Sequence, residues 1–237
     1  MDRYSADALN PFRAFGAEEA FDQLADLVVR PSCTREVIDL VTLAGEHGIP
    51  IIPYGGGTGV MGGTVPVRGG IILDMNRMNR ILSINPMDLT AQVEPAVVLQ
   101  DLVAALAEHG LMPGHDPYSV PIATVAGTIS TNGVGYRAAA VGPMGNQVVA
   151  IEAVLPDGKV ITTPPVPKYS VGPNLNQLFI GSEGVFGVIV KATIQVFRMP
   201  EDRAFDAVAF DDFDRGFRGA AELLALGIRP TLLDLSE

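Results

Sequence analysis

The stretch of sequence that decides the fold is Pro53-Tyr54-Gly55-Gly56-Gly57-Thr58-Gly59-Val60-Met61-Gly62-Gly63. It follows an apolar run at 49–52 and leads into a second apolar run at 70–74. Three consecutive glycines remove every Cβ from one piece of backbone, which can then turn sharply and direct several N–H groups at one anion. This loop therefore predicts a phosphate-binding site.

Gly57, Gly59 and Gly62 also spell the G-x-G-x-x-G fingerprint of Rossmann nucleotide-binding folds. That fingerprint requires the last glycine to open a helix that crosses to the next parallel strand, and a crossover needs roughly a dozen residues. Only residues 63–69 separate the loop from the next apolar run. Nicotinamide binding of the Rossmann type is therefore disfavoured, and a glycine-rich hairpin without a ligand is the plainer alternative.

Composition excludes several classes of protein. The chain has 237 residues, of which 48% are hydrophobic, and a formal net charge of -11. An acidic chain is a poor candidate for binding nucleic acid or an anionic membrane. No apolar run is long enough for a membrane span, and the N-terminus does not have the pattern of a signal peptide. Cys33 is the single cysteine, so we expect a cytoplasmic protein without disulfides, and three dispersed histidines predict no metal site.

Periodicity predicts alternating helices and strands from residue 34 onwards, whereas residues 1–30 are weakly helical. Thr34 is the predicted N-cap of a first helix that stops at Gly48. Residues 121–146 are small and turn-rich, and a new unit begins with a strand at 204–210 and a helix at 213–226. The other predicted elements are strands at 49–53, 70–74, 82–84, 90–93, 148–155, 159–162 and 188–197, and helices at 99–109 and around 175–178.

Two further glycine-rich clusters follow the first loop. One runs from Gly114 to Ser119 and continues through 123–133, and the other covers 181–189. Each cluster alone is a weak signal. Together, each flanked by strand-like runs, they indicate one long ligand that the main chain holds at several points. A dinucleotide suits this description because it has flat rings at its ends and a charged diphosphate between them.

In their order and spacing, Tyr54–Gly63, Thr124–Gly133 and Gly181–Ile189 resemble the FAD-binding (PCMH-type) domain of the vanillyl-alcohol oxidase and p-cresol methylhydroxylase flavoproteins. The resemblance covers roughly residues 25 to 200. Its nearest branches are the glycolate or D-lactate dehydrogenases and the alkylglycerone-phosphate synthases. It implies an α+β fold with an FAD-binding domain at 1–200, in two subdomains (about 1–76 and 77–200), followed at 201–237 by the beginning of an incomplete cap domain.

The resemblance also implies particular contacts. Residues 53–59 would hold the diphosphate through backbone N–H groups, and 118–124 would run beside the flavin and ribityl chain. Residues 131–134 would add further contacts, 181–187 would pass close to the cofactor, and the backbone of Ile189 would meet the adenine. The cofactor-binding residues implied in this way are Pro53, Tyr54, Gly55, Gly56, Gly57, Thr58, Gly59, Tyr118, Ser119, Thr124, Gly127, Thr131, Asn132, Gly133, Val134, Gly181, Glu183, Gly184, Gly187 and Ile189.

Departures from the family pattern limit what carries over. Several relatives attach FAD covalently through a histidine in the first loop, where this chain offers Thr58, so non-covalent FAD is expected. Asp234 lies near the position where alkylglycerone-phosphate synthases often carry an arginine, which counts against a phosphate substrate. In the hydroxy-acid enzymes the catalytic base and the metal-binding histidines belong to a later segment, which is absent from this chain. We therefore predict no catalytic residue.

Two polar side chains near the clusters have competing interpretations. His115 precedes Asp116-Pro117, which favours an ordinary turn histidine over a contact to flavin or substrate. Glu183 resembles a general base, but its position in a backbone-contact loop favours a carboxylate bonded to neighbouring backbone.

The leading prediction is an FAD-dependent oxidoreductase that takes a hydride from a 2-hydroxy acid or related alcohol to flavin N5. One alternative is a transferase like alkylglycerone-phosphate synthase, which uses FAD without net redox change. Another is a truncated flavin-binding module, inactive alone, with a homodimer or a partner subunit supplying the missing cap. The predicted ligands are FAD and a small-molecule substrate.

Overall fold

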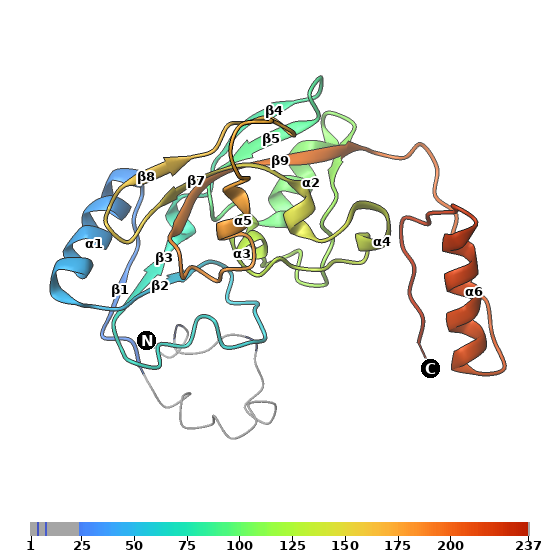
Figure 1. Cartoon of the computed structure of the whole chain (residues 1–237), viewed down its shortest axis with the longest axis horizontal. Coiled ribbons are helices and arrows are strands. Elements are labelled where there is room, and N and C mark those ends of the chain that lie inside the picture. Colours follow the sequence, from blue (N-terminus) through green and yellow to red (C-terminus); the bar gives the residue numbers. More distant parts are fainter. Residues whose placement is uncertain (1–3, 5–7, 9–23, 237) are drawn as a thin grey trace.

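Two β-sheets form the body of the molecule, which a computed structural model describes at Tyr4, Ala8 and residues 24–236 (Figure 1). Strands β1, β2 and β3 form the small sheet, strands β4 to β9 form the large one, and helix α6 stands apart from both. This arrangement is the α+β, two-subdomain fold that the sequence predicts.

The small sheet has three parallel strands in the order β1-β3-β2. They are β1 (Leu27–Val29), β2 (Ile51–Tyr54) and β3 (Ile71–Asp74). Helix α1 (Thr34–His47) is the crossover from β1 to β2 and buries Val37, Val41 and Ala44. No helix lies within residues 55–70, although β2 and β3 are parallel neighbours. The predicted absence of a Rossmann crossover helix is therefore confirmed, whereas β1 was missed in a segment predicted to be weakly helical.

Local sequence rules predict the ends of α1 only in part. Gly48, with a φ of 65°, ends the helix as predicted. Thr34 is the first helical residue and not the N-cap, because that position belongs to Cys33, whose side chain makes no capping bond. Glu36 closes the helix start instead: its Oε2 accepts hydrogen bonds from the Ser32 N–H at 2.6 Å and from Ser32 Oγ at 3.1 Å. These bonds lower the pKa of the Glu36 carboxyl.

The large sheet is antiparallel, with strand order β4-β5-β9-β7-β8 and β6 paired to β9. Its strands are β4 (Ile81–Asn85), β5 (Thr90–Val93), β6 (Leu111–Pro113), β7 (Val148–Val154), β8 (Val160–Thr162) and β9 (Val188–Arg198). The long strand β9 and the β7–β8 hairpin are both as predicted. Strand β6 was not predicted, because a strand of three residues is too short to show a hydrophobic period.

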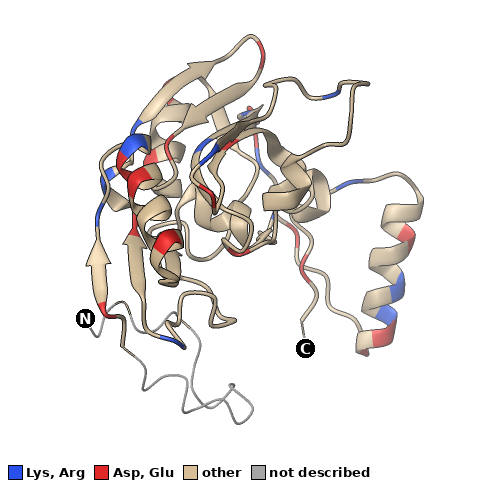
Figure 2. Ribbon diagram, turned by 60° about the vertical axis from the view of Figure 1, so that its left-hand side comes forward, with Lys and Arg blue, Asp and Glu red and all other residues tan. Residues whose placement is uncertain are grey.

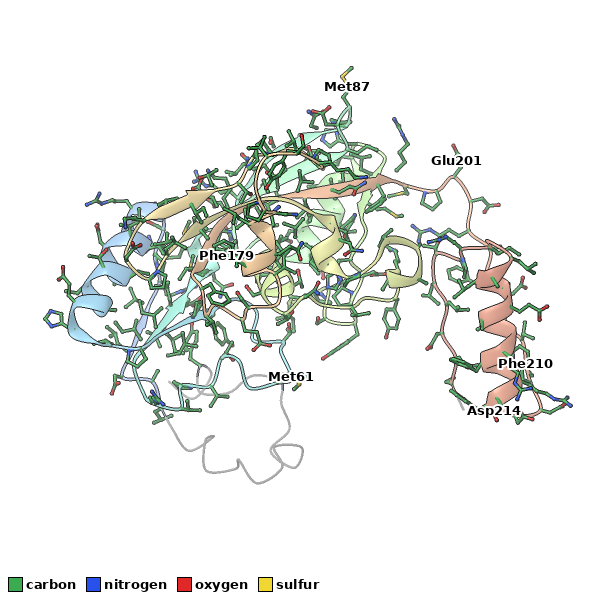
Figure 3. The ribbon with its side chains drawn as sticks, in the orientation of Figure 1. Met61, Met87, Phe179, Glu201, Phe210 and Asp214 are labelled. Carbon is green, nitrogen blue, oxygen red and sulfur yellow. The ribbon has the colours of Figure 1, made fainter. Side chains whose placement is uncertain are left out.

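Short helices cover the large sheet and its junction with the small one. They are α2 (Leu99–Ala107), α3 (Val125–Ser130), α4 (Ala138–Val141) and α5 (Asn176–Phe179), with 3-10 turns η4 (Met75–Arg77) and η5 (Met144–Gln147). Leu102 and Leu106 of α2, Ile129 of α3 and Phe179 of α5 belong to one core cluster with β5 and β9; Phe179 lies inside the body in Figure 3. Helix α3 lies in the stretch that we expected to be turns.

A second core cluster joins the two sheets. Val37 and Val41 of α1 pack in it with Leu73 of β3, Val154 of β7 and Val190 of β9. Because these side chains come from both sheets, the subdomains share a buried apolar interface, and burial of such surface stabilises their fixed placement at about 25 cal/mol per Å². A cavity opens where the two sheets meet.

The last segment differs from the body. Helix α6 (Phe213–Ala225) confirms the predicted helix, but 204–210 forms no strand. Residues 204–210 are exposed and pair with no described strand, and an isolated strand has no ladder to stabilise it. Figures 1 and 3 show this segment beside the body, with Phe210 close to α6. Phe205, Val208 and Phe217 are exposed.

Candidate functional site

A cavity of about 360 Å³ opens between the small sheet and the large one. Residues of all three glycine-rich clusters line it: the loop after β2, the segment from His115 to Val134, and the bend from Glu183 to Ile189. All of the predicted contact residues except Asn132 and Gly181 lie at its wall. The structure thus brings three clusters that are far apart in sequence to one place.

The first loop has no room for side chains at its three glycines. A Cβ on Gly55 would overlap the hydroxyl of Thr124, and one on Gly56 would overlap the carbonyl oxygen of Ile122. Gly57 has a φ of 65°, and a Cβ there would overlap the hydroxyl of Tyr54. Each glycine is therefore required for its own steric reason, and the loop packs directly on the segment that precedes α3.

Four N–H groups of the first loop have no acceptor among the described residues. Among described residues, the N–H groups of Gly55, Gly56, Gly57 and Thr58 donate to no protein acceptor. These residues are half-buried and line the cavity. A run of such unpaired donors is the feature that binds phosphate oxygens in main-chain anion sites.

Polar side chains at the end of β3 hold the first loop in place. Asn76 donates from Nδ2 to the carbonyl oxygen of Gly55 at 3.1 Å. The Asp74 carboxylate, only 1% exposed, accepts from the Asn76 N–H at 3.0 Å and from the Tyr4 hydroxyl at 2.7 Å, and it pairs with Arg30 Nε at 2.9 Å. The end of β3 is thus an anchor that holds the loop's entry in one position.

The third bend is tied to the second cluster by its own amides. The Gly181 N–H donates to the Ile129 carbonyl oxygen and the Glu183 N–H to that of Ser130, both at 3.0 Å. Gly184, with a φ of 87°, lies against the Pro53 side chain, where a Cβ would stand 2.9 Å from Cγ. The bend is therefore packed on α3 and on the first loop. We expected backbone N–H groups of all three clusters to bind the ligand. Only the first cluster has a continuous run of N–H groups without an acceptor among the described residues.

Two predicted contact residues lie behind the cavity wall. Asn132 accepts a hydrogen bond from the Gly145 N–H at its Oδ1, at 2.9 Å, and Gly181 faces the Asn132 Cβ. Glu183 does line the cavity, but its carboxylate makes no hydrogen bond to any described group and rests beside Gly63. The predicted bond from Glu183 to neighbouring backbone is wrong, because the exposed side chain extends along the cavity edge.

Little formal charge surrounds the cavity. Among the described residues at its wall, Glu183 is the only charged side chain, and no lysine or arginine is present. In the view of Figure 2, acidic and basic segments are interspersed over the ribbon, including α1 and α6. Backbone N–H groups and hydroxyl groups, and not side-chain cations, are therefore the donors that the described wall offers to an anion.

Other residues at the wall escaped prediction. Gly63, Thr64, Met75, Pro95, His115 and Ser130 line the cavity. Ser130 adjoins the predicted residue Thr131, and Gly63 ends the first glycine-rich loop, so the clusters themselves could have indicated both. Pro95 lies in a segment without any glycine signal, and only the fold brings it near.

Buried polar atoms test whether a polar cofactor fits here. Thr64 Oγ1 and His115 Nδ1 are buried without a hydrogen-bond partner among the described residues, and both residues line the cavity. Natural proteins satisfy most buried polar groups. With the unpaired amides of the first loop, Thr64 and His115 make a wall suited to a ligand that carries both phosphate oxygens and polar ring atoms, as FAD does.

The described residues were also compared with the requirements of a membrane-spanning helix and of a metal site. No described helix has the length and apolar character to cross a membrane. Within the described ranges, no three His, Cys, Asp or Glu side chains gather where they could hold a metal ion.

Comparison with known proteins defines the class. Residues 25–164 match the family described as FAD binding domain. This match covers more than half of the chain, so the chain belongs to that family of FAD-binding domains, as the sequence motifs indicate.

Particular relatives fall in both branches named above. The chain is 33% identical to glycolate oxidase subunit GlcD of Bacillus subtilis, over 93% of this chain and 47% of the relative. It is 37% identical to D-lactate dehydrogenase of Archaeoglobus fulgidus, over 100% of this chain and 52% of the relative. It is 33% identical to alkyldihydroxyacetonephosphate synthase of Trypanosoma brucei brucei, over 90% of this chain and 35% of the relative.

Solved structures agree with the fold. An alkyldihydroxyacetonephosphate synthase structure superposes with a TM-score of 0.74 at 27% identity, over 86% of this chain and 36% of that chain. The chain spans about half the length or less of the relatives it matches, from 35% to 52% for the three above. The expected family, fold and FAD cofactor are confirmed by these findings.

Proposed function

We propose that this chain is the FAD-binding part of an FAD-dependent oxidoreductase that oxidises a 2-hydroxy acid or a related alcohol. The observation that carries the proposal is the cavity in which three glycine-rich segments meet, in a chain that belongs to a family of FAD-binding domains. Bound FAD would supply the hydride acceptor, and the protein would hold, orient and shield it.

The first loop would bind the diphosphate. Its unpaired N–H groups at Gly55, Gly56, Gly57 and Thr58 support this role. Because Thr58 stands where some relatives carry the linking histidine, we propose that the cofactor is held without a covalent bond. Cys33 is exposed and does not line the cavity, so it offers no attachment point there.

The other clusters would hold the ring systems. Tyr118, Ser119 and Thr124 would lie beside the flavin and ribityl chain, and they line the cavity. Ile189 would meet the adenine with its backbone. In the described sheet it pairs with Ala153 of β7 but lies beyond the end of the β5 ladder, so that side of β9 has no strand partner.

A transferase like alkyldihydroxyacetonephosphate synthase is the second candidate. The superposition with a structure of that enzyme favours it. The described cavity wall, without lysine or arginine, gives no support for a phosphate-bearing substrate. Flavin bleaching by a 2-hydroxy acid under anaerobic conditions would favour the oxidoreductase. Turnover of an acyl dihydroxyacetone phosphate without bleaching would favour the transferase.

The substrate chamber would require a cap domain in addition to the FAD-binding domain. We propose that an FAD-binding domain ends near residue 200 and that 201–237 begins a cap domain. Exposed Phe205, Phe217 and Leu226 support this, because such side chains are normally buried in a completed domain. A homodimer or a partner subunit would then supply the remaining cap. The chain by itself would be expected to bind FAD without turnover.

We place the protein in the cytoplasm.

An absorption spectrum of the purified protein tests the central claim. Flavin bands that pass into the supernatant after acid precipitation are expected for non-covalent FAD. A colourless protein that takes up no FAD in titration would refute the proposal. Colour that stays in the precipitate would contradict only the non-covalent attachment.

A further inference from the structure

His115 lies buried in the cavity wall with no protein partner for its ring. The residue is 3% exposed, and Nδ1 is buried without a hydrogen-bond partner among the described residues. The other nitrogen, Nε2, is on the side of the ring that faces Gly133, where a Cβ would stand 3.0 Å away. An ordinary turn histidine would point its ring at solvent, so this placement calls for another role.

The backbone around His115 is fixed by polar contacts. Its N–H donates to Gln147 Oε1 at 2.8 Å, and Gln147 is 1% exposed. The next residue, Asp116, pairs with Arg137 Nη2 at 3.2 Å, and Arg137 Nη1 donates to the Pro113 carbonyl oxygen at 2.9 Å. The ring therefore projects from a segment that is held on both sides.

Two glycines make room for this arrangement. A Cβ on Gly133 would crowd both Cε1 and Nε2 of the His115 ring at 3.0 Å. A Cβ on Gly114 would lie 2.7 Å from the Gln147 oxygen that holds the His115 backbone. Part of the glycine content of the second cluster is thus explained by the packing of one histidine.

The ring is neutral at physiological pH. Burial lowers the pKa of His115 to about 4, although the charge of Asp116 acts in the opposite direction. Neutral imidazole carries one proton, and buried N–H donors without acceptors are rarer than buried acceptors without donors. Nδ1 is buried without a partner among the described residues, whereas Nε2 is not among the buried unpartnered atoms and so keeps access to a ligand. The proton therefore belongs on Nε2. The ring then offers one N–H donor.

We propose that His115 is a flavin-contact residue that donates a hydrogen bond from Nε2 to an acceptor atom of the bound flavin ring. This inference rests on the proposed function, in which the cavity holds FAD. Flavin nitrogens and carbonyl oxygens gain electron density on reduction, and a fixed donor stabilises developing negative charge. His115 would therefore strengthen FAD binding and raise the reduction potential of the bound flavin.

Two variants separate hydrogen bonding from packing. His115→Leu replaces the ring with an apolar side chain and removes the donor. His115→Gln instead places an amide N–H near the position of Nε2. His109→Leu, at an exposed site after α2, is the matched control. The measurements are the FAD dissociation constant by fluorescence titration and the reduction potential against a reference dye.

For His115→Leu we expect FAD binding weaker by roughly three- to tenfold, the effect of one neutral hydrogen bond. We also expect a more negative potential by about 30 mV, which is a tenfold change in a two-electron equilibrium. His115→Gln should retain most of both properties, and the control should match the wild type. If His115→Leu does not fold, His115→Asn, whose shorter amide does not reach the Nε2 position, replaces it.

Equal dissociation constants and potentials for wild type and His115→Leu would overturn the inference. A His115→Gln variant as impaired as His115→Leu would overturn it as well, because the ring would then act through its shape. A wild-type protein that binds no FAD would instead defeat the proposed function, so the two failures are distinguishable.

Discussion

The first loop and the third bend are both rich in glycine, and both line the same cavity, yet their backbones do different things. In the first loop the N–H groups from Gly55 to Thr58 have no acceptor in the part of the chain that the structure describes. In the third bend the N–H groups of Gly181 and Glu183 bond to carbonyl oxygens of α3. Similar composition therefore leaves unpaired N–H donors in one segment and serves packing in the other.

This difference shows that glycine content alone does not identify a binding loop. Glycine is needed wherever the chain approaches another group closely or adopts a positive φ, whether or not a ligand is near. What distinguishes the two segments is where their amides point. Four changes test this distinction, beginning with the largest expected effect.

Gly56→Ala should be the most damaging change. Its Cβ would overlap the backbone carbonyl of Ile122, which has no flexible side chain to move aside. We expect a loss of about 3 kcal/mol in the free energy of unfolding, typical of overpacking, together with loss of FAD binding. Gly45→Ala, whose Cβ would make an ordinary contact in α1, is the control for denaturation and FAD titration. Unchanged FAD affinity in Gly56→Ala would contradict the steric account of the first loop.

Acid should destabilise the protein through His115. Burial depresses its pKa in the folded state to about 4, so between the ordinary value of 6.5 and 4 the unfolded state binds more protons. The contribution to stability is present above pH 6.5 and is lost as the pH falls through this window. We expect a decrease on the order of 2 kcal/mol in the wild type. Chemical denaturation at several pH values should show a shallower slope for His115→Leu, and parallel slopes would exclude His115 as the cause.

Gly181→Ala tests directly whether the third bend differs from the first loop in serving packing and not cofactor binding. Gly181 has a φ of 73° and lies behind the cavity wall, with its N–H bonded to Ile129. A left-handed conformation for alanine should cost about 1–2 kcal/mol of stability while leaving FAD affinity of the folded protein unchanged. A large loss of FAD affinity with no loss of stability would show that the third bend contacts the cofactor through this residue.

Asn76→Ala should have the smallest effect. It removes two hydrogen bonds from Nδ2, one to the Gly55 carbonyl oxygen, which anchors the entry of the first loop, and one to the Asp74 carboxylate. We expect a loss of about 1 kcal/mol in stability and a two- to threefold weaker FAD affinity, because the Asp74 carboxylate keeps its other partners. Asn85→Ala, which removes side-chain hydrogen bonds at the exposed end of β4 and away from the cavity, is the control for FAD affinity. FAD affinity equal to that of the wild type would mean that the loop holds its shape without Asn76.

Local patterns predicted the regular elements of this protein well. The apolar period of α1, its glycine stop at Gly48 and the alternation in β9 are properties of neighbouring residues, so they can be recognised without the fold. Thr34 and residues 204–210 show the limit of such rules. The cap position moved by one residue because Glu36 bonds to Ser32, and a β-prone segment formed no strand because no partner strand lies beside it.

The sequence predicted the three segments that form the candidate site. It did not predict which residues of those segments face the cavity. The order of the glycine clusters indicated FAD, and most of the predicted residues line one cavity. Whether a residue faces the cavity or lies behind it depends on contacts between distant segments. Gly181 and Asn132 were predicted as contacts yet lie behind the wall, whereas Pro95 and His115 lie at it.

By itself, the sequence determined the family, the α+β class and the cofactor, because glycine spacing and hydrophobic period are written along the chain. Only the tertiary structure decided which amides stay unpaired, which glycines face another backbone, and that the ring nitrogen Nδ1 of His115 is buried without a hydrogen-bond partner among the described residues. Those properties arise between residues that the sequence separates and the packing of two sheets brings together, so no local pattern contains them.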